Sequence, residues 1–319
     1  IEPINRFNST CSPSDDAEGS CFGGAARLFT LINQMRDAIT AQGDPVLVLS
    51  AGDSSQGSLF FTTYGGAAEA ELNNLIGLDA MAVGNHEFDD GPEVLAGFMD
   101  SVGFPVLMSN ADVSQEPTLA NKLAKSTIIE RGGEMLGLIG LTPEDTDELA
   151  SPGKNITFSD PVAAVQGEVD RLTAEGVNTI IVLSHSGYAV DLDVAANTSG
   201  VDVIVGGHSN TYLSNTSDRA SGPYPTMVGE TAIVQAYAYG KFLGELNVSF
   251  DDAGNLVEAA GEPLIMDGAV VEDMATVERI AELAGPLEEI RQKVVANAGS
   301  TVNGDRAVCR VMECEMGNL

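Results

Sequence analysis

The sequence has few basic residues. Lys and Arg together number 15 among 319 residues, against 47 Asp and Glu, which gives a formal net charge of −32. A protein that binds the nucleic-acid backbone needs a basic face, so this balance argues against a nucleic-acid polymer as a partner. An anionic substrate would need a local source of positive charge, and a bound metal ion is the usual one.

Tryptophan is absent, aromatic residues make up 5% of the chain, and 44% of the residues are apolar. No apolar run approaches the ~18 residues that a membrane-spanning helix needs, so we expect no transmembrane segment in this chain. The apolar content is typical of a folded protein with a sizeable core. Ile1 opens the sequence without Met or an apolar leader, which favours a processed or shortened product and says nothing about its compartment.

Cysteine is also scarce: the chain has 4, and they form the close pairs Cys11 with Cys21 and Cys309 with Cys314. Neither spacing is the C-x-x-C of a zinc knuckle or a redox motif. Two short-loop disulfides in an oxidising compartment are the favoured interpretation, and free thiols in a cytosolic protein are the alternative. N-glycosylation sequons favour the same compartment if the source is eukaryotic. They lie at Asn8, Asn155, Asn197, Asn215 and Asn247.

Short apolar runs rich in Val, Ile and Leu alternate with helix-like stretches through most of the chain. This alternation indicates an α/β fold with largely parallel strand pairing. The predicted strands are 46–49, 80–83, 106–108, 136–141, 179–183 and 201–205, with further strands within 226–250. The predicted helices are 24–39, 67–76, 93–102 and 162–175, and residues 1–22 are predicted to be a loop. A last helical stripe over 273–296, interrupted at Gly285-Pro286, is either a link between domains or a C-terminal helix on the same core.

The chain has only 3 histidines, and each comes directly after a predicted strand: His86, His185 and His208. Asp53 follows another strand, and Asn85 precedes His86. Because the carboxyl ends of parallel strands meet at one edge of a sheet, we expect these side chains to lie together there. Glycines just before them permit sharp turns. Imidazoles with a carboxylate suit Zn²⁺, Mn²⁺ or Fe rather than Ca²⁺. The alternative is three isolated loop histidines, each with a local hydrogen bond.

The segment Gly84-Asn85-His86-Glu87-Phe88-Asp89 resembles the Asn-His motif of the calcineurin-like metallophosphoesterases. Two further motifs match in order and spacing, Gly52-Asp53 with Gly57-Ser58 and the run 206–211. More narrowly, the chain is similar to the ecto-5′-nucleotidase family and its secreted or periplasmic relatives. That closer likeness also rests on 24–30, Phe104-Pro105, 184–187 and 309–319, and it is collinear from Ile1 to Leu319.

The resemblance implies an αββα sandwich with its metal site at the C-terminal ends of the strands. It implies a phosphohydrolase that removes the 5′-phosphate of nucleoside monophosphates by the attack of a water activated by two divalent metals. Zinc is expected first, with manganese, cobalt and magnesium as alternatives. Carried across, Asp53 bridges both ions, and the second ion is completed by Asn85, His185 and His208. Asn210 is a further contributor.

The resemblance also gives His86 a place off the metals, where it stabilises developing charge or acts as the general acid, oriented by Asp89. Asp89 lies three residues beyond His86, close enough for its carboxylate to hold the imidazole. Asn85 and Arg310 would contact the substrate, although a solvated surface charge is the alternative role for Arg310. The nucleotide is thus the expected partner.

Two departures from the family pattern modify these expectations. The Asp-x-His motif that supplies ligands to the first metal is expected just before Ile1 and is not in this sequence. The family also continues into a domain that grips the nucleoside, of which residues 300–319 would be the start. We therefore expect a catalytic domain over 1–272, a linker helix over 273–299, and poor activity of this chain on its own. A homodimer would form through the absent domain.

Other functions are compatible with the same residues. A nucleotide diphosphatase or UDP-sugar hydrolase, or a cyclic-nucleotide phosphodiesterase, would use the same site. An inactive, secreted nucleotide-binding relative is the alternative if the Asp-x-His pair is truly missing, and a purely structural α/β domain would leave the candidate ligands unexplained. The resemblance and the cysteine pairs together predict an extracellular, cell-surface or periplasmic protein.

Overall fold

A computed structural model describes residues 1–7, 10–294, 297, 299–309 and 311–318. They form two compact units, Ile1–Leu283 and Ala284–Leu319. The sequon at Asn8 and the candidate substrate contact Arg310 lie outside the described residues, so both stay predictions.

Two sheets make up the centre of the first unit. Their strands are β3 (Leu49–Ser50), β4 (Ala80–Ala82), β5 (Val106–Leu107), β7 (Ser126–Arg131), β8 (Glu134–Leu141), β10 (Thr179–Ser184), β11 (Val203–Gly206), β12 (Thr226–Val228) and β13 (Thr231–Val234). The larger sheet has six strands in the order β12-β13-β11-β10-β8-β7, and the smaller has three in the order β3-β4-β5. All neighbours pair in parallel except the two edge strands β7 and β12, which are antiparallel to β8 and β13.

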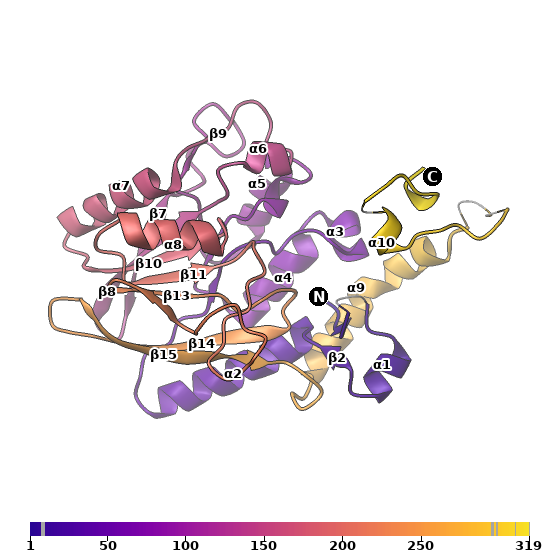
Figure 1. Ribbon diagram of the computed structural model, residues 1–319, viewed down its shortest axis with the longest axis horizontal. Coiled ribbons are helices and arrows are strands. Elements are labelled where there is room, and N and C mark those ends of the chain that lie inside the picture. The colour runs from indigo at the N-terminus through magenta and orange to yellow at the C-terminus, as the bar shows by residue number, and fades with distance from the viewer. Residues whose placement is uncertain (8–9, 295–296, 298, 310, 319) are drawn as a thin grey trace. The chain divides into compact units, whose positions relative to one another are not determined.

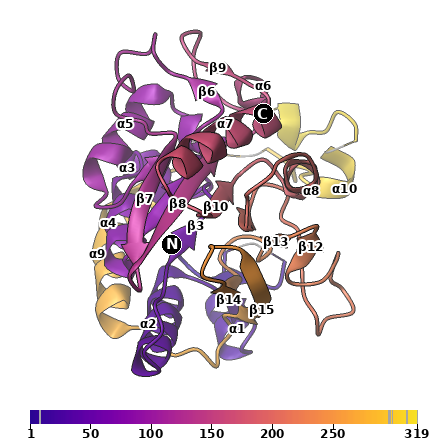
Figure 2. The same cartoon turned by 90° about the vertical axis from the view of Figure 1, so that its left-hand side faces the viewer.

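Helices cover the outer faces of both sheets. The principal ones are α2 (Ala25–Ala41), α4 (Ala67–Ile76), α5 (Pro92–Ser101), α7 (Pro161–Ala174) and α8 (Tyr188–Asn197). Buried side chains of α7 and α8 share a core with the larger sheet, and those of α4 and α5 share one with β4. Figures 1 and 2 show α7 and α8 on the opposite side of the strands from α4 and α5.

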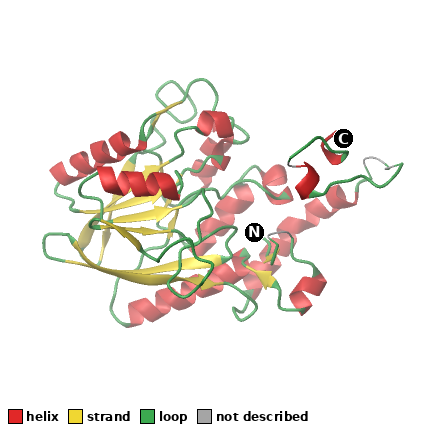
Figure 3. Ribbon diagram, viewed as in Figure 1, coloured by secondary structure: helices red, strands yellow, loops and turns green. Residues whose placement is uncertain are grey.

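A third core lies between the two sheets. Ala82 of β4 and Leu107 of β5 pack with Leu138 and Leu183 of the larger sheet. Gly140 permits this close packing, because a Cβ there would lie 2.1 Å from the carbonyl oxygen of Leu107. The layers therefore run helix, sheet, sheet, helix. Figure 3 shows the strands with helices around them, and the predicted αββα sandwich is confirmed.

The remaining elements of the first unit are short, apart from one long antiparallel ribbon. They are β1 (Ile4–Asn5), α1 (Pro13–Ala17), β2 (Cys21–Phe22), α3 (Leu59–Tyr64), η1 (His86–Phe88), β6 (Ala111–Asp112), α6 (Thr146–Leu149), β9 (Thr157–Phe158) and the ribbon strands β14 (Phe242–Phe250) and β15 (Leu256–Ile265). The strands predicted within 226–250 are thus present. The segment 1–22, predicted to be a loop, contains β1, α1 and β2.

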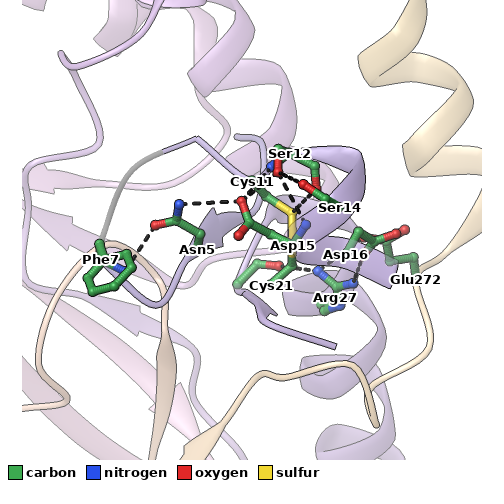
Figure 4. Close-up of a disulfide and its surroundings, with 11 residues drawn as sticks. Asn5, Phe7, Cys11, Ser12, Ser14, Asp15, Asp16, Cys21, Arg27 and Glu272 are labelled. Atoms are coloured by element: carbon green, nitrogen blue, oxygen red, sulfur yellow. Dashed lines mark hydrogen bonds and ion pairs between the residues drawn. A yellow bond between two sulfur atoms is a disulfide. The ribbon is translucent and has the colours of Figure 1, made fainter. Parts of the chain in front are cut away.

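Both predicted disulfides are formed, Cys11 with Cys21 and Cys309 with Cys314. Figure 4 shows the first beside α1, which begins with a capping box of Ser12 and Asp15. Beneath it the buried guanidinium of Arg27 donates to the carbonyl of Gly23 and forms ion pairs with Asp16 and Glu272. The Cys11–Cys21 disulfide therefore closes a loop that hydrogen bonds and ion pairs also stabilise.

The helix α9 (Met274–Gln292) begins in the first unit and ends in the second. It runs through Pro286, so the predicted interruption at that residue is wrong. Proline removes one helical N–H, but the bonds on either side of it can still hold the turn. The second unit also contains α10 (Arg306–Cys309) and η2 (Met316–Asn318). No helix among the described residues has both the length and the apolar composition that crossing a bilayer requires.

Candidate metal centre

Polar side chains from both sheets meet where the strands end. Asp53 and Asn85 follow β3 and β4 of the smaller sheet, whereas His185 and His208 follow β10 and β11 of the larger one. The expectation that a single sheet would present all of them is therefore wrong, because a strand-end pattern does not reveal which strands pair. The convergence itself is present, and the contacts below connect residues far apart in the sequence.

The imidazole of His185 faces the carboxylate of Asp53 across this junction. Its Nε2 lies 2.8 Å from Asp53 Oδ2, and its Nδ1 lies 2.6 Å from the carbonyl oxygen of Ala51. Only Nδ1–H can donate to that carbonyl, so Nε2 carries a lone pair in the neutral ring. Nε2 is buried, and in the neutral ring it has no proton to donate to the Asp53 carboxylate. Two lone-pair atoms this close repel each other unless a proton or a cation lies between them.

The pKa values of this pair reflect the same contact. Burial acts to raise the pKa of Asp53, but the His185 imidazole and the backbone N–H of His86 outweigh it, so the pKa lies below its ordinary value. Burial acts to lower the pKa of His185, but the carboxylates of Asp53 and Glu87 outweigh it and the pKa is raised. The pair therefore favours positive charge between the two side chains.

His208 lies beside the same pair. Its Nδ1 is 3.0 Å from Asn85 Oδ1, and burial together with the nearby His185 lowers its pKa, which favours the neutral ring. One potential ligand atom from each of Asp53, His185 and His208 lies within 4.8 Å of the others. Ligand atoms that share a divalent ion at ~2.1 Å lie about 3 Å apart. The unpartnered Nε2, the neutral imidazole and the carboxylate fit such an ion.

The backbone is strained at two of these residues. Asp53 and His208 have φ values of 58° and 63°, in the left-handed region that non-glycine residues rarely occupy. Two glycines allow the chain to pass close by. A Cβ on Gly84 would lie 2.2 Å from Asp53 Oδ1, and one on Gly207 would lie 3.0 Å from His185 Nδ1. Strain of this kind persists where the surrounding structure holds it, and it is common at functional sites.

His86 lies at the edge of the cluster. Its Nδ1 is 2.7 Å from Asp89 Oδ2, and its side chain is 43% exposed. The backbone N–H of His86 donates to Asp53 Oδ1. The amide of Gln56 also donates to Asp89 Oδ2. The ring is therefore tethered at Nδ1 while the rest of it remains accessible.

Asn210 is the one described candidate ligand that the structure does not join to the others. It lies two residues beyond His208 on the same turn and is exposed. No contact among the described residues links its side chain to Asp53, Asn85, His185 or His208.

Two buried residues that support the site were missed by the sequence reasoning. Glu87 accepts hydrogen bonds from the backbone N–H groups of Gly84, Asp53 and Ser55. Burial and the charge of Asp53 raise its pKa. Gln235 directly follows β13, the same strand-end position that singled out the histidines. That signal could have found Gln235, and an acidic residue inside a ligand motif could have pointed to Glu87.

Comparison with known proteins agrees with this geometry. The chain is 40% identical over 311 residues to the 5′-nucleotidase of Rattus norvegicus, an alignment that covers 94% of this chain and 53% of the rat protein. It is 37% identical over 331 residues to the 5′-nucleotidase of Diplobatis ommata, covering 99% of this chain and 56% of that protein. The chain thus spans about half the length of these relatives.

Solved structures show the same relationship. The crystal structure of a 5′-nucleotidase precursor from Thermus thermophilus superposes with a TM-score of 0.84 at 39% identity, covering 100% of this chain and 62% of that one. The NAD nucleotidase of Haemophilus influenzae superposes with a TM-score of 0.78 at 26% identity, covering 86% of this chain and 63% of that one. The sequence pattern of the calcineurin-like phosphoesterases matches residues 18–212. The chain therefore belongs to the calcineurin-like phosphoesterase family.

Proposed function

We propose that this chain carries the catalytic site of a metal-dependent phosphohydrolase that removes the 5′-phosphate of nucleoside monophosphates. The observation that supports this most is the convergence of Asp53, Asn85, His185 and His208 beside a separate His86–Asp89 pair. Family membership supports the reaction class, and the names of the similar proteins support the nucleotide substrate.

Asp53, Asn85, His185 and His208 would hold a divalent ion. Such an ion would neutralise phosphate charge and lower the pKa of a bound water, which addresses the difficulty of attracting an anionic substrate to a chain of net charge −32. The Ala51 carbonyl fixes the tautomer of His185 so that Nε2 is the ligand atom. The lowered pKa of His208 favours the neutral imidazole, which is the form that binds an ion.

We propose that His86 acts at the leaving 5′-oxygen. Asp89 holds Nδ1, so Nε2 is the atom that carries a proton toward the substrate. The exposure of this ring suits a group that meets a ligand from solvent, whereas His185 is buried. Asn85, next to it in the chain, would contact both the ion and the phosphate.

Asp53, shared with the first ion, and Asn210 would hold a second divalent ion in the same proposal, and zinc is the first candidate metal. Arg310 is proposed as a contact to the substrate phosphate. The paired cysteines support an extracellular, cell-surface or periplasmic location. Among the sequons that the structure describes, Asn197, Asn215 and Asn247 are exposed and Asn155 is half-buried, so the first three are the better glycosylation candidates.

The test is metal-dependent phosphate release by the purified chain, stripped with EDTA and reloaded with Zn²⁺ or Mn²⁺. We expect release from AMP in the loaded wild type and its loss in H86A, whatever the absolute rate. Release from ADP or UDP-glucose, or hydrolysis of a cyclic nucleotide, without release from AMP would favour the alternative enzymes. Nucleotide binding with no release from any of these would favour an inactive relative.

A further inference from the structure

The turn that carries His208 is held in an unfavourable conformation. His208 and Asn210 have φ values of 63° and 52°, both in the left-handed region. The N–H of Ser209 donates to the carbonyl of Gly207 at 2.7 Å, which closes a three-residue turn centred on His208. A γ-turn with positive φ at a non-glycine residue is rare and strained. It persists only where neighbouring groups hold it.

Gln235 makes the contacts that hold this turn. Its side chain is 2% exposed and lies directly after β13. Its Nε2 donates to the Gly207 carbonyl at 2.8 Å. Its Oε1 accepts from the Ser209 hydroxyl at 3.1 Å and from the Thr211 N–H. One buried amide therefore satisfies polar groups on three residues of the turn.

These contacts alternate with the strained positions. Gly207 and Ser209 flank His208, and Ser209 and Thr211 flank Asn210. A side chain that fixes the residues on both sides of a left-handed residue leaves it little freedom to relax toward negative φ. The carbonyl of Gly207 accepts from both Ser209 N–H and Gln235, so the closing bond of the turn and the contact to Gln235 share one atom.

We propose that Gln235 is a positioning residue that fixes the turn 206–211 and, through it, the direction of the His208 imidazole toward Asn85 and Asp53. The proposal rests on the proposed function where it concerns metal binding. Groups that orient a ligand from behind typically contribute about 10- to 100-fold to metal affinity. Gln235 itself touches neither the ion nor the substrate.

The experiment measures the affinity of the EDTA-treated chain for Zn²⁺ alone, by competition with a chromophoric chelator. Q235M keeps a buried, unbranched side chain but removes all three contacts, and we expect about 10- to 100-fold weaker binding. T231V is the matched control. Thr231 lies on the same strand and donates one buried hydrogen bond to the Val201 carbonyl. It lies at the other end of β13, so its loss should change zinc affinity by less than about twofold.

A double-mutant cycle separates positioning from general stability. If Gln235 acts through His208, Q235M should cost much less zinc affinity in an H208A background than in the wild type. An equal cost in both backgrounds, or wild-type affinity in Q235M, would overturn the proposal. Q235N is the second variant should Q235M not fold. It keeps a polar amide but withdraws it by one methylene, and unchanged affinity in Q235N would also overturn the proposal.

The same experiments distinguish an error in the proposed metal site from an error in the role of Gln235. If the wild type itself binds no zinc, the metal site is wrong, and crystal structures of the metal-free wild type and Q235M decide the role of Gln235. We expect His208 to leave the left-handed region in Q235M and the hydrogen bond from Ser209 N–H to the Gly207 carbonyl to break. An unchanged turn would refute it.

Discussion

His185 Nε2 lies 2.8 Å from Asp53 Oδ2, and the other nitrogen of the ring donates to the carbonyl of Ala51. These residues are 132 positions apart in the chain and follow strands of different sheets, so the contact depends on the docking of the two sheets. A buried nitrogen lone pair beside a half-buried carboxylate is costly without a shared cation. We infer that this junction is built to hold positive charge.

The first prediction concerns the different roles proposed for two histidines, His208 as a metal ligand and His86 as the general acid. H208A should weaken zinc binding by at least about 100-fold, because a neutral imidazole is removed from the ligand set. H86A should keep its zinc affinity and lose about 100- to 10,000-fold in turnover. Chelator competition and phosphate release measure the two quantities on the same preparations. Loss of zinc in H86A, or unchanged zinc affinity in H208A, would contradict the assignment.

The second prediction concerns Asp89. In D89N an amide replaces the carboxylate that holds His86 Nδ1, so the ring loses its orientation and its preferred tautomer. We expect turnover of AMP to fall about 100-fold, and turnover of p-nitrophenyl phosphate to fall much less, because its leaving group departs without protonation. D90N, the same change at the exposed neighbouring residue, is the control. Equal losses for both substrates would count against a role of His86 at the leaving oxygen.

Glu87 gives the third prediction. Its carboxylate accepts from three backbone N–H groups at 2.7 to 3.0 Å, and in E87Q one of its two oxygens becomes an amide that cannot accept. We expect unfolding free energy to fall by about 2 kcal/mol, measured by urea denaturation. E134Q, an exposed residue of β8, should change it by less than about 0.5 kcal/mol. Equal stability of E87Q and E134Q would show that these bonds do not hold the loops.

The fourth prediction concerns pH and a buried carboxyl at the opposite end of the strands. Burial raises the pKa of Asp202 from 3.8 to about 6, although the N–H groups of Ile180 and Leu256 donate to it. Between pH 4 and pH 6 the folded state therefore binds a proton that the unfolded chain has lost. The contribution of Asp202 to unfolding free energy consequently falls as pH rises through this window and is level above it.

D202N cannot titrate, so its stability relative to the wild type should increase from pH 4 to pH 7, by about 1 to 2 kcal/mol after allowance for solvent screening. Chemical denaturation of both proteins across this pH range measures the difference, in which all other titrating groups cancel. A difference that stays constant, or that changes in the opposite direction, would contradict the raised pKa.

The layered fold follows from the sequence because its strands are buried on both faces. Such strands appear as continuous apolar runs. The predicted run 136–141 lies within β8, and the predicted run 179–183 lies within β10. The helix 67–76 has the predicted bounds, because glycines lie on both sides of its apolar stripe. Strand pairing was not predictable, since a run of Val and Ile carries no information on its neighbour. The apolar runs by themselves therefore did not reveal the division into two sheets, which only the family resemblance implied.

The candidate site was likewise predictable only in part. Residues whose chemistry is rare in this chain, above all the histidines, were predicted as a cluster from their positions after strands. Asn210 shares the turn of His208 but not its contacts, because left-handed backbone at both residues directs successive side chains in ways that a motif does not specify. Glu87 and Gln235 bind mainly backbone groups. Because nearly every residue type carries the same backbone N–H and carbonyl, the sequence does not show which residues these side chains will contact.

Anomalous diffraction from crystals of the zinc-loaded chain, recorded on both sides of the zinc absorption edge, is the decisive experiment for this metal centre. We predict a zinc peak in contact with Asp53, Asn85, His185 and His208, with His86 outside the ligand set, and the number of peaks there gives the number of ions. A zinc-loaded crystal with no peak between these four side chains, or with His86 bound to the metal in place of His185 or His208, would contradict it.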